Sequence, residues 1–122
     1  MKNTVLQTQQ ISIGYQNKTK QKIVAQNISI QLHAGNFITL IGTNGVGKST
    51  LLRSITGIIK PLKGEVMLND SNIQNYTNAQ LAQQLSVVLT DKLPPSNLTV
   101  FELVALGRQP YTNWLGNLSD LD

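Results

Sequence analysis

Residues 42–50 combine residue types and a spacing that suit them to binding phosphate groups. Their sequence, GTNGVGKST, fits the pattern G-x-x-x-x-G-K-[ST] at every fixed position. The three glycines can adopt positive φ, which lets the backbone wrap closely around an anion and turn N–H groups toward it. Lys48 is placed to reach the β- and γ-phosphates, Ser49 to offer its hydroxyl to Mg²⁺, and Thr50 to donate near the α-phosphate. We therefore expect a nucleoside triphosphate with Mg²⁺, bound by Gly42, Thr43, Asn44, Gly45, Val46, Gly47, Lys48, Ser49 and Thr50.

The residues on either side of this segment match the surroundings that a phosphate loop needs. An apolar run, FITLI at 37–41, precedes it and predicts a strand. A helical pattern begins at Leu51, and Gly57 is placed to end that helix. A loop between a strand and a helix presents the positive end of the helix dipole to the ligand. A glycine-rich turn without a ligand would not require these flanks, so we favour the phosphate loop.

The remaining elements expected from the sequence would hold this loop in place. Alternation of apolar and polar residues predicts strands at 5–15 and 22–32, joined by a polar turn at 16–20. Short apolar runs predict two further strands, at 65–68 and 85–89. Thr77 has the position of a helix N-cap, and Thr99 with Glu102 has the spacing of a capping box. The second of these helices is expected to close at Pro110.

Composition and charge exclude several classes of function. The 122 residues are sufficient for a hydrophobic core, 40% of them are apolar, and there is no cysteine for a disulfide or a thiolate metal site. The net charge is +4, but the basic residues are scattered and do not alternate with aromatic residues, so a nucleic-acid groove is not indicated. No apolar stretch reaches the length of a membrane span. A soluble cytosolic protein is therefore the default expectation.

With these residues in view, the chain resembles the ATP-binding subunits of ABC transporters over its whole length. The loop and its continuation, GTNGVGKSTLLR, are similar to the ABC form of the phosphate loop. Tyr15, in IGY, matches the position at which this family stacks an aromatic residue on adenine; without the family it would be an aromatic residue at a strand end. Residues 61–66, PLKGEV, are similar to the P-x-x-G-x-V turn of the family. Residues 104–111, VALGRQPY, resemble importers of iron–siderophore, haem or cobalamin complexes.

The resemblance implies a fold, partners and a location. The fold class is α/β, a P-loop NTPase of the ABC nucleotide-binding type, truncated to the N-terminal antiparallel strands, part of the parallel core sheet and the start of the helical subdomain. Residues 1–122 would form a partial domain that contains the Walker A half and lacks the signature and Walker B half. The implied partners are a second ATP-binding subunit, arranged head to tail, and membrane permease subunits. The implied location is the cytoplasmic face of the membrane, peripheral and attached through the permease.

Two departures from the family pattern affect catalysis. The family has a glutamine where the strand at 85–89 ends, and this position, the Q-loop position, is occupied by the shorter Thr90. The sequence also has no D-E pair after four apolar residues, so no catalytic residue is assigned. We therefore expect this chain to bind ATP without appreciable turnover, although the family's activity is ATP hydrolysis coupled to import.

Two other functions stay open at this stage. In a kinase-like or GTPase-like enzyme with a phosphate loop, Asp91 at a strand end could hold Mg²⁺. In a non-catalytic interaction fragment, Val100, Phe101 and Tyr111 would serve mainly as contacts with a partner. Ordinary core packing is the alternative for these three residues, and it is favoured more for Phe101 than for Tyr111.

Overall fold

The computed structural model describes residues 3–90 and 97–112. The chain divides into two compact units, the first ending at Tyr76 and the second beginning at Thr77. In both units, no described helix has the length and apolar character needed to cross a membrane.

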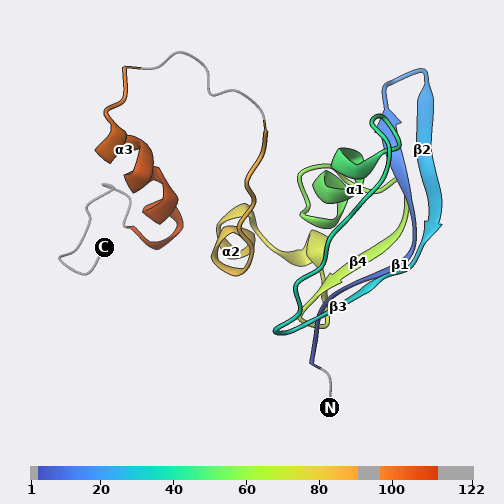
Figure 1. Cartoon of the computed structure of the whole chain (residues 1–122), viewed down its shortest axis with the longest axis horizontal. Helices are drawn as coiled ribbons and strands as arrows, with labels where there is room; N and C mark the ends of the chain where they lie inside the picture. Colours follow the sequence, from blue (N-terminus) through green and yellow to red (C-terminus); the bar gives the residue numbers. More distant parts are fainter. Residues whose placement is uncertain (1–2, 91–96, 113–122) are drawn as a thin grey trace. The chain divides into compact units, whose positions relative to one another are not determined.

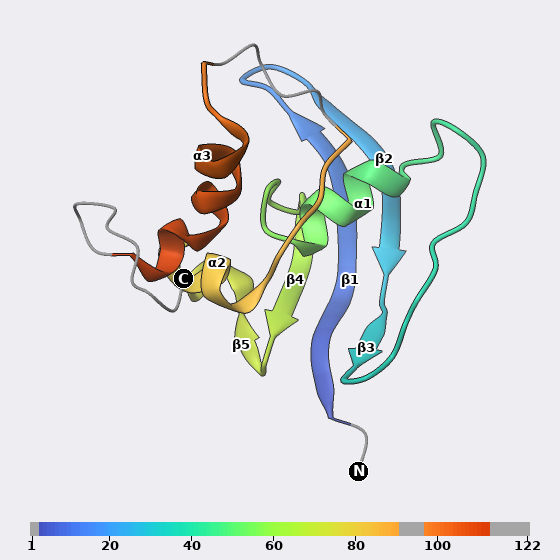
Figure 2. The same ribbon diagram turned by 60° about the vertical axis from the view of Figure 1, so that its left-hand side comes forward.

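The first unit is built on a five-stranded sheet in which every pairing is antiparallel. The long strand β1 pairs on one side with β2 and β3 and on the other with β4, which in turn pairs with β5 (Figures 1 and 2). The strands expected at 5–15 and 65–68 are confirmed, and the one expected at 22–32 is divided between β2 and β3. Their bounds are β1 Thr4–Gln16, β2 Gln21–Ile28, β3 Gln31–His33, β4 Lys63–Leu68 and β5 Ser71–Asn72.

The β1–β2 hairpin is fixed by its turn. The N–H of Asn17 donates to the carbonyl of Lys20 at 2.8 Å, so residues 16 and 21 face each other across the strands. Two positions further from the turn, Gly14 pairs with Ile23. A Cβ at Gly14 would overlap the carbonyl oxygen of Lys22. Glycine at this position therefore lets the two strands approach closely just before Tyr15.

The core of the first unit lies between the sheet and helix α1 (Lys48–Ile55). Ile11, Ile13 and Val66 contribute fully buried side chains from the sheet, and Ile55 is buried from the helix. The helix lies along one face of the sheet (Figures 1 and 2). As expected, it ends at a glycine: Gly57 has φ +78° and its N–H donates to the carbonyl of Ser54 at 3.3 Å. Helix α1 is thus held against the sheet by burial of apolar side chains.

The second unit contains short helices whose N-termini are capped as the sequence predicts. Helix α2 (Asn78–Gln84) begins after Thr77, and helix α3 (Val100–Ala105) begins after Thr99. The 3₁₀ helix η2 (Leu106–Tyr111) follows α3 directly and includes Pro110. The expectation that Pro110 closes the helical segment is therefore wrong by one residue. A further 3₁₀ helix, η1 (Ile73–Asn75), belongs to the first unit and was not anticipated.

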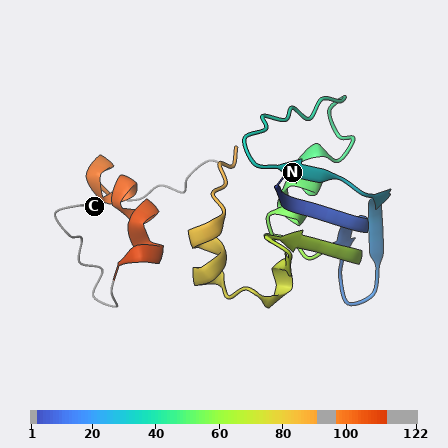
Figure 3. The same ribbon diagram turned by 90° about the horizontal axis from the view of Figure 1, so that it is seen from below.

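Two expected strands do not form. Residues 37–41 lie in the loop that leads from β3 to α1 (Figure 3), with Phe37 96% exposed and Ile41 86% exposed. Residues 85–89 are likewise irregular, and Val88 is 97% exposed. A strand is stable only when a neighbour satisfies its backbone hydrogen bonds. Within 3–90 and 97–112 no strand pairs with either segment, so the expected part of a parallel core sheet is not seen there.

Candidate nucleotide-binding site

A cavity of about 330 Å³ lies between the β1–β2 hairpin and the start of α1. Most of the expected ligand-binding residues meet here, although they come from segments far apart in the sequence. Three expected residues, Gly42, Thr43 and Val46, do not line it. The lining residues are Tyr15, Lys22, Val24, Asn44, Gly45, Gly47, Lys48, Ser49 and Thr50.

The glycines of the phosphate loop differ in conformation. Gly45 has φ +82° and Gly47 has φ +109°, values at which any other residue would be strained. Gly42 does not have positive φ, so the expectation for the three glycines holds at two of them. The turn at residues 43–46 is closed by the N–H of Val46, which donates to the carbonyl of Thr43 at 3.4 Å. The loop thus bends sharply at 45–47, directly before the helix.

Lys48 is oriented by the loop itself. Its Nζ donates to the carbonyl oxygens of Gly42 and Thr43, each at 2.7 Å. An ammonium group has three donors, so these two contacts leave a third for a phosphate oxygen. Gly42 and Thr43 therefore serve the site indirectly, by holding the ammonium at the edge of the cavity.

The first turn of α1 supplies the other groups that could bind an anion. The first intrahelical bond runs from the N–H of Leu51 to the carbonyl of Gly47, at 2.8 Å. The N–H groups of residues 48–50 therefore lack acceptors within the helix, and the helix dipole adds a positive partial charge. Ser49 is exposed on the wall of the cavity and Thr50 is buried. This geometry can accept the oxygens of a phosphate group.

The donor set fits a magnesium ion bound together with phosphate. Mg²⁺ prefers oxygen ligands and is usually held by one or two protein groups together with phosphate oxygens and water. Ser49 offers one such oxygen at the cavity. Across the described ranges, no three His, Cys, Asp or Glu side chains are grouped so that they could hold a metal by themselves. Ser49 would therefore share the ion with the ligand's phosphates.

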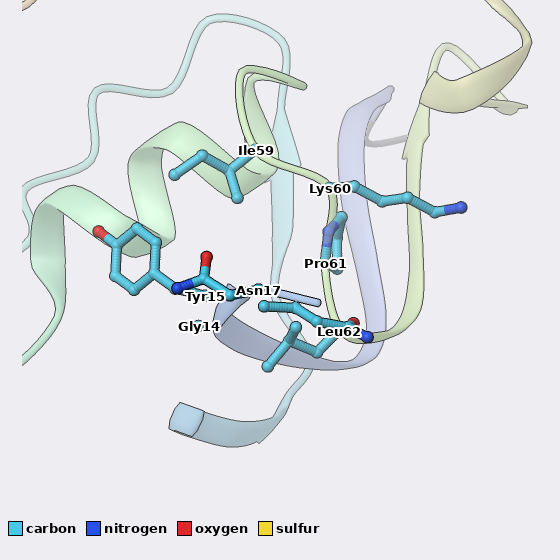
Figure 4. Close-up of a pocket in the computed structure, with 8 residues that line it drawn as sticks. Gly14, Tyr15, Asn17, Ile59, Lys60, Pro61 and Leu62 are labelled. Atoms are coloured by element: carbon cyan, nitrogen blue, oxygen red, sulfur yellow. The ribbon is translucent and has the colours of Figure 1, made fainter. Parts of the chain in front are cut away.

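Tyr15 forms the wall of the cavity opposite the loop. The residue is 45% exposed, and its hydroxyl lies 3.1 Å from Oγ1 of Thr50. It also borders a second cavity, of about 500 Å³, formed with the connector between α1 and β4 (Figure 4). Ile59, Pro61 and Leu62 line that cavity, and the Lys60 side chain extends away from Tyr15 (Figure 4). The ring is thus accessible to a flat ligand group.

Sequence reasoning missed Lys22 and Val24, which both lie on β2. A Cβ at Gly47 would come within 2.5 Å of Cγ1 of Val24, so Val24 packs directly against the loop. Lys22 pairs with Tyr15 across the hairpin. The turn at residues 17–20 could have identified Lys22. Two residues before this turn is Tyr15 and two residues after it is Lys22, so the two residues lie opposite each other.

Other residues singled out in the sequence belong to the second unit or lie outside the described residues. Thr90 is exposed and belongs to the second unit, so its Q-loop assignment stays a prediction. Asp91 lies outside the described residues. Val100 is 80% exposed and Phe101 72% exposed, so core packing is wrong for Phe101 in this structure. Tyr111 is 52% exposed, with its hydroxyl 3.3 Å from the Gln83 carbonyl that accepts its hydrogen bond.

Comparison with protein families and curated proteins gives a consistent result. A family model described as ABC transporter matches residues 25–120. An uncharacterized ABC transporter ATP-binding protein of Methanocaldococcus jannaschii is 41% identical, over 97% of this chain and 39% of the relative. The achromobactin transport ATP-binding protein of Dickeya dadantii is 40% identical, over 98% of this chain and 43% of the relative. The ferric enterobactin transport ATP-binding protein of Escherichia coli is 36% identical, over 89% of this chain and 40% of the relative.

Among solved structures, a putative ABC transporter ATP-binding protein from Pyrococcus furiosus is similar to this chain. It is 38% identical, covers 57% of this chain and 32% of its own, and superposes with a TM-score of 0.50. The chain therefore spans about two fifths of the length of the curated relatives that it matches.

Proposed function

Because this chain belongs to the ABC transporter family, we propose that it is the nucleotide-binding part of an ATP-binding subunit of an importer. The supporting observation is the cavity in which the Tyr15 ring faces the phosphate loop and the start of α1. An aromatic face at one end and a ring of backbone N–H groups with an ammonium at the other suit the two ends of a nucleotide. The ligand proposed is ATP with Mg²⁺.

Each site residue has a distinct role in this proposal. Tyr15 stacks on the base, Lys48 binds the β- and γ-phosphates, and Ser49 shares Mg²⁺ with them. Thr50 donates a hydrogen bond near the α-phosphate. When it is bound, Mg²⁺ would neutralise part of the negative charge of the phosphates. Asn44, Gly45 and Gly47 surround the phosphates with backbone groups, while Gly42, Thr43 and Val46 shape the loop.

Binding without appreciable turnover is the activity we propose for this chain alone. Phosphoryl transfer to water requires a group that positions the attacking water and further charge on the transferred phosphate. Within 3–90 and 97–112, the residues that line the cavity include two lysines but no carboxylate and no histidine. The whole protein is proposed to hydrolyse ATP with residues outside this chain and with a second ATP-binding subunit arranged head to tail.

The transported cargo is inferred from the relatives. The curated relatives named above include transport proteins for achromobactin and ferric enterobactin. Both names agree with the importer-like segment at 104–111. We propose that the whole protein drives uptake of an iron–siderophore complex, with haem or cobalamin complexes as the wider class. Its other partners would be membrane permease subunits, which would hold it at the cytoplasmic face of the membrane.

Equilibrium binding to the full chain tests the nucleotide proposal. Isothermal titration with Mg-ATP should give saturable binding, and Lys48→Ala should weaken it by at least about a hundredfold, because the variant loses a charge-assisted contact and the bonds that shape the loop. Lys63→Ala, which removes the same charge at an exposed residue that lines neither cavity, should bind like the original chain. Absence of saturable binding to folded protein would refute the proposal, as would normal binding by Lys48→Ala. Phosphate release that disappears in Lys48→Ala would contradict only the absence of turnover.

An uptake assay tests the cargo. Cells that lack the gene should lose uptake of radiolabelled ferric siderophore and regain it with the intact gene, but not with a gene carrying Lys48→Ala. Normal siderophore uptake in the deleted strain, together with loss of haem or cobalamin uptake, would indicate that the cargo is a haem or cobalamin complex instead. Normal uptake of all three would refute the import proposal.

The two alternative functions receive less support. The family match favours an ABC subunit over a kinase-like or GTPase-like enzyme. The kinase-like or GTPase-like alternative is tested by measuring nucleotide affinity in the presence of Mg²⁺ for Asp91→Asn. An unchanged affinity would show that Asp91 does not bind the metal. The interaction-fragment function is favoured by the exposure of Val100 and Phe101 on α3, and it is compatible with nucleotide binding by the first unit.

A further inference from the structure

The nucleotide cavity contains a second cation in addition to the phosphate-loop lysine. Lys22 stands at the beginning of β2 and lines the same cavity as Lys48, Ser49 and Thr50. It is the register partner of Tyr15 in the antiparallel β1–β2 pair. Residues directly opposite each other in such a pair carry their side chains on the same face of the sheet. Lys22 therefore projects from the hairpin beside the aromatic ring that faces the loop.

The Tyr15 side chain indicates how far Lys22 can reach. The Tyr15 hydroxyl lies 3.1 Å from Oγ1 of Thr50, so one extended tyrosine side chain spans the gap from β1 to the first turn of α1. An extended lysine is similar in length to tyrosine, and its four-carbon stem is flexible. Starting from the neighbouring strand, the Lys22 ammonium can reach the region just in front of that turn, which is the region assigned to the phosphates.

The charges around the cavity identify the class of group that Lys22 would contact. The described residues that line it include two ammonium groups and no carboxylate. Lys48 is directed by two carbonyl oxygens of the loop, at 2.7 Å each. Two positive charges at one cavity, with no acidic side chain among the described lining residues, attract a ligand that carries several negative charges. A polyphosphate has this character and a nucleobase or ribose does not.

We propose that Lys22 is a second cationic contact for the polyphosphate tail of the nucleotide, acting from the hairpin side of the cavity opposite Lys48. This inference rests on the proposed function and adds a residue that the phosphate-loop pattern does not contain. Lys22 raises affinity in proportion to the number of phosphates on the ligand. It contributes nothing to recognition of the base, which is left to Tyr15.

Binding of ATP, ADP and AMP by the full chain and its Lys22→Gln variant tests this role. Each Kd is measured by competition against a fluorescent ATP analogue at two salt concentrations. Lys22→Gln should weaken ATP binding by about two- to fivefold, as expected for an exposed ion pair, and should weaken AMP binding less, because AMP carries fewer negative charges. The salt dependence of ATP binding should also become shallower, because one charge contact is lost. Lys22→Arg should retain most of the affinity.

The β1–β2 turn provides a matched control. Lys20→Gln removes the same charge two residues away, at a position that does not line the cavity. It should leave ATP affinity unchanged if Lys22 acts by contact, and should match Lys22→Gln if only the overall charge matters. Equal effects of the two variants would overturn the inference, and so would equal losses for ATP and AMP in Lys22→Gln. If Lys48→Ala abolishes binding while Lys22→Gln has no effect, the proposed function stands and this inference alone fails.

Discussion

The hydroxyl oxygen of Tyr15 lies 3.1 Å from Oγ1 of Thr50, so the end of β1 and the first turn of α1 are joined across the cavity. Thr50 is buried, whereas Tyr15 is exposed. A hydroxyl group can accept one hydrogen bond while it donates another. Tyr15 can therefore donate to Thr50 while Thr50 donates to a phosphate oxygen, and the roles proposed for the two residues are compatible.

This contact allows the ring of Tyr15 and its hydroxyl to be tested separately. Tyr15→Ala removes the stacking surface and should weaken Mg-ATP binding by about ten- to a hundredfold. Tyr15→Phe keeps the ring and loses only the hydrogen bond, so its effect should be no more than about threefold. Both values follow from titration of the full chain. If Tyr15→Phe loses as much affinity as Tyr15→Ala, the hydroxyl and not the ring is what matters.

Gly14 is predicted to be necessary for the hairpin that presents Tyr15. A Cβ at this position would overlap the backbone carbonyl of Lys22, which cannot move without separating β1 from β2. Gly14→Ala should therefore lower the free energy of unfolding of the first unit by about 1–3 kcal/mol. The measurement is the urea midpoint followed by circular dichroism of the sheet. Gly107→Ala is the control, since a Cβ there meets nothing within 4 Å, and its midpoint should hardly change.

Two glycines of the loop should respond differently to substitution by alanine. Gly45 (φ +82°) and Gly47 (φ +109°) both have positive φ, but only the Cβ at Gly47 would collide with Val24, at 2.5 Å from its Cγ1. Gly45→Ala should show only the backbone cost of about 1–2 kcal/mol, and Gly47→Ala a greater loss of stability and of ATP affinity. Adding Val24→Ala to Gly47→Ala should restore part of that loss. No recovery in the double variant would mean that backbone strain alone explains the effect of Gly47→Ala.

The two capping boxes of the second unit should differ in their response to acid. Glu102 accepts hydrogen bonds from Oγ1 and N–H of Thr99, both at 2.7 Å, and these bonds lower the pKa of its carboxyl group. Because the folded pKa lies below the unfolded one, the cap stabilises α3 above the unfolded pKa. That contribution is lost as the pH falls through the lowered folded pKa. Gln80 makes the equivalent bond to the Thr77 N–H at 2.9 Å and cannot titrate.

Amide hydrogen exchange across an acid titration measures this difference. Protection of the Thr99 and Glu102 N–H groups should decline at the acidic end, while that of Thr77 and Gln80 persists as long as the second unit remains folded. In Glu102→Gln the decline at Thr99 should disappear, because a glutamine can accept the same bond at every pH. A parallel decline at Thr77 would show that the unit unfolds as a whole and that the Glu102 carboxylate is not the cause.

The sequence by itself determined those features that depend on near neighbours. The phosphate-loop pattern located the bend before α1, and Thr77, Thr99 and Gly57 marked helix ends that the structure confirms. Caps and glycine turns are set by hydrogen bonds and φ values within a few residues. The polar turn between the first two strands was predictable for the same reason, because it depends on residues that are close in the sequence.

Tertiary structure decided which residues share the cavity and which apolar segments become strands. Lys22 and Val24 face the phosphate loop because the hairpin packs beside α1, and no pattern within either segment records that packing. Residues 37–41 have the composition of a buried strand but no paired neighbour among the described residues, so they remain exposed. Strand formation and cavity walls depend on contacts between distant parts of the chain, and their energy comes from burial and pairing rather than from local preference.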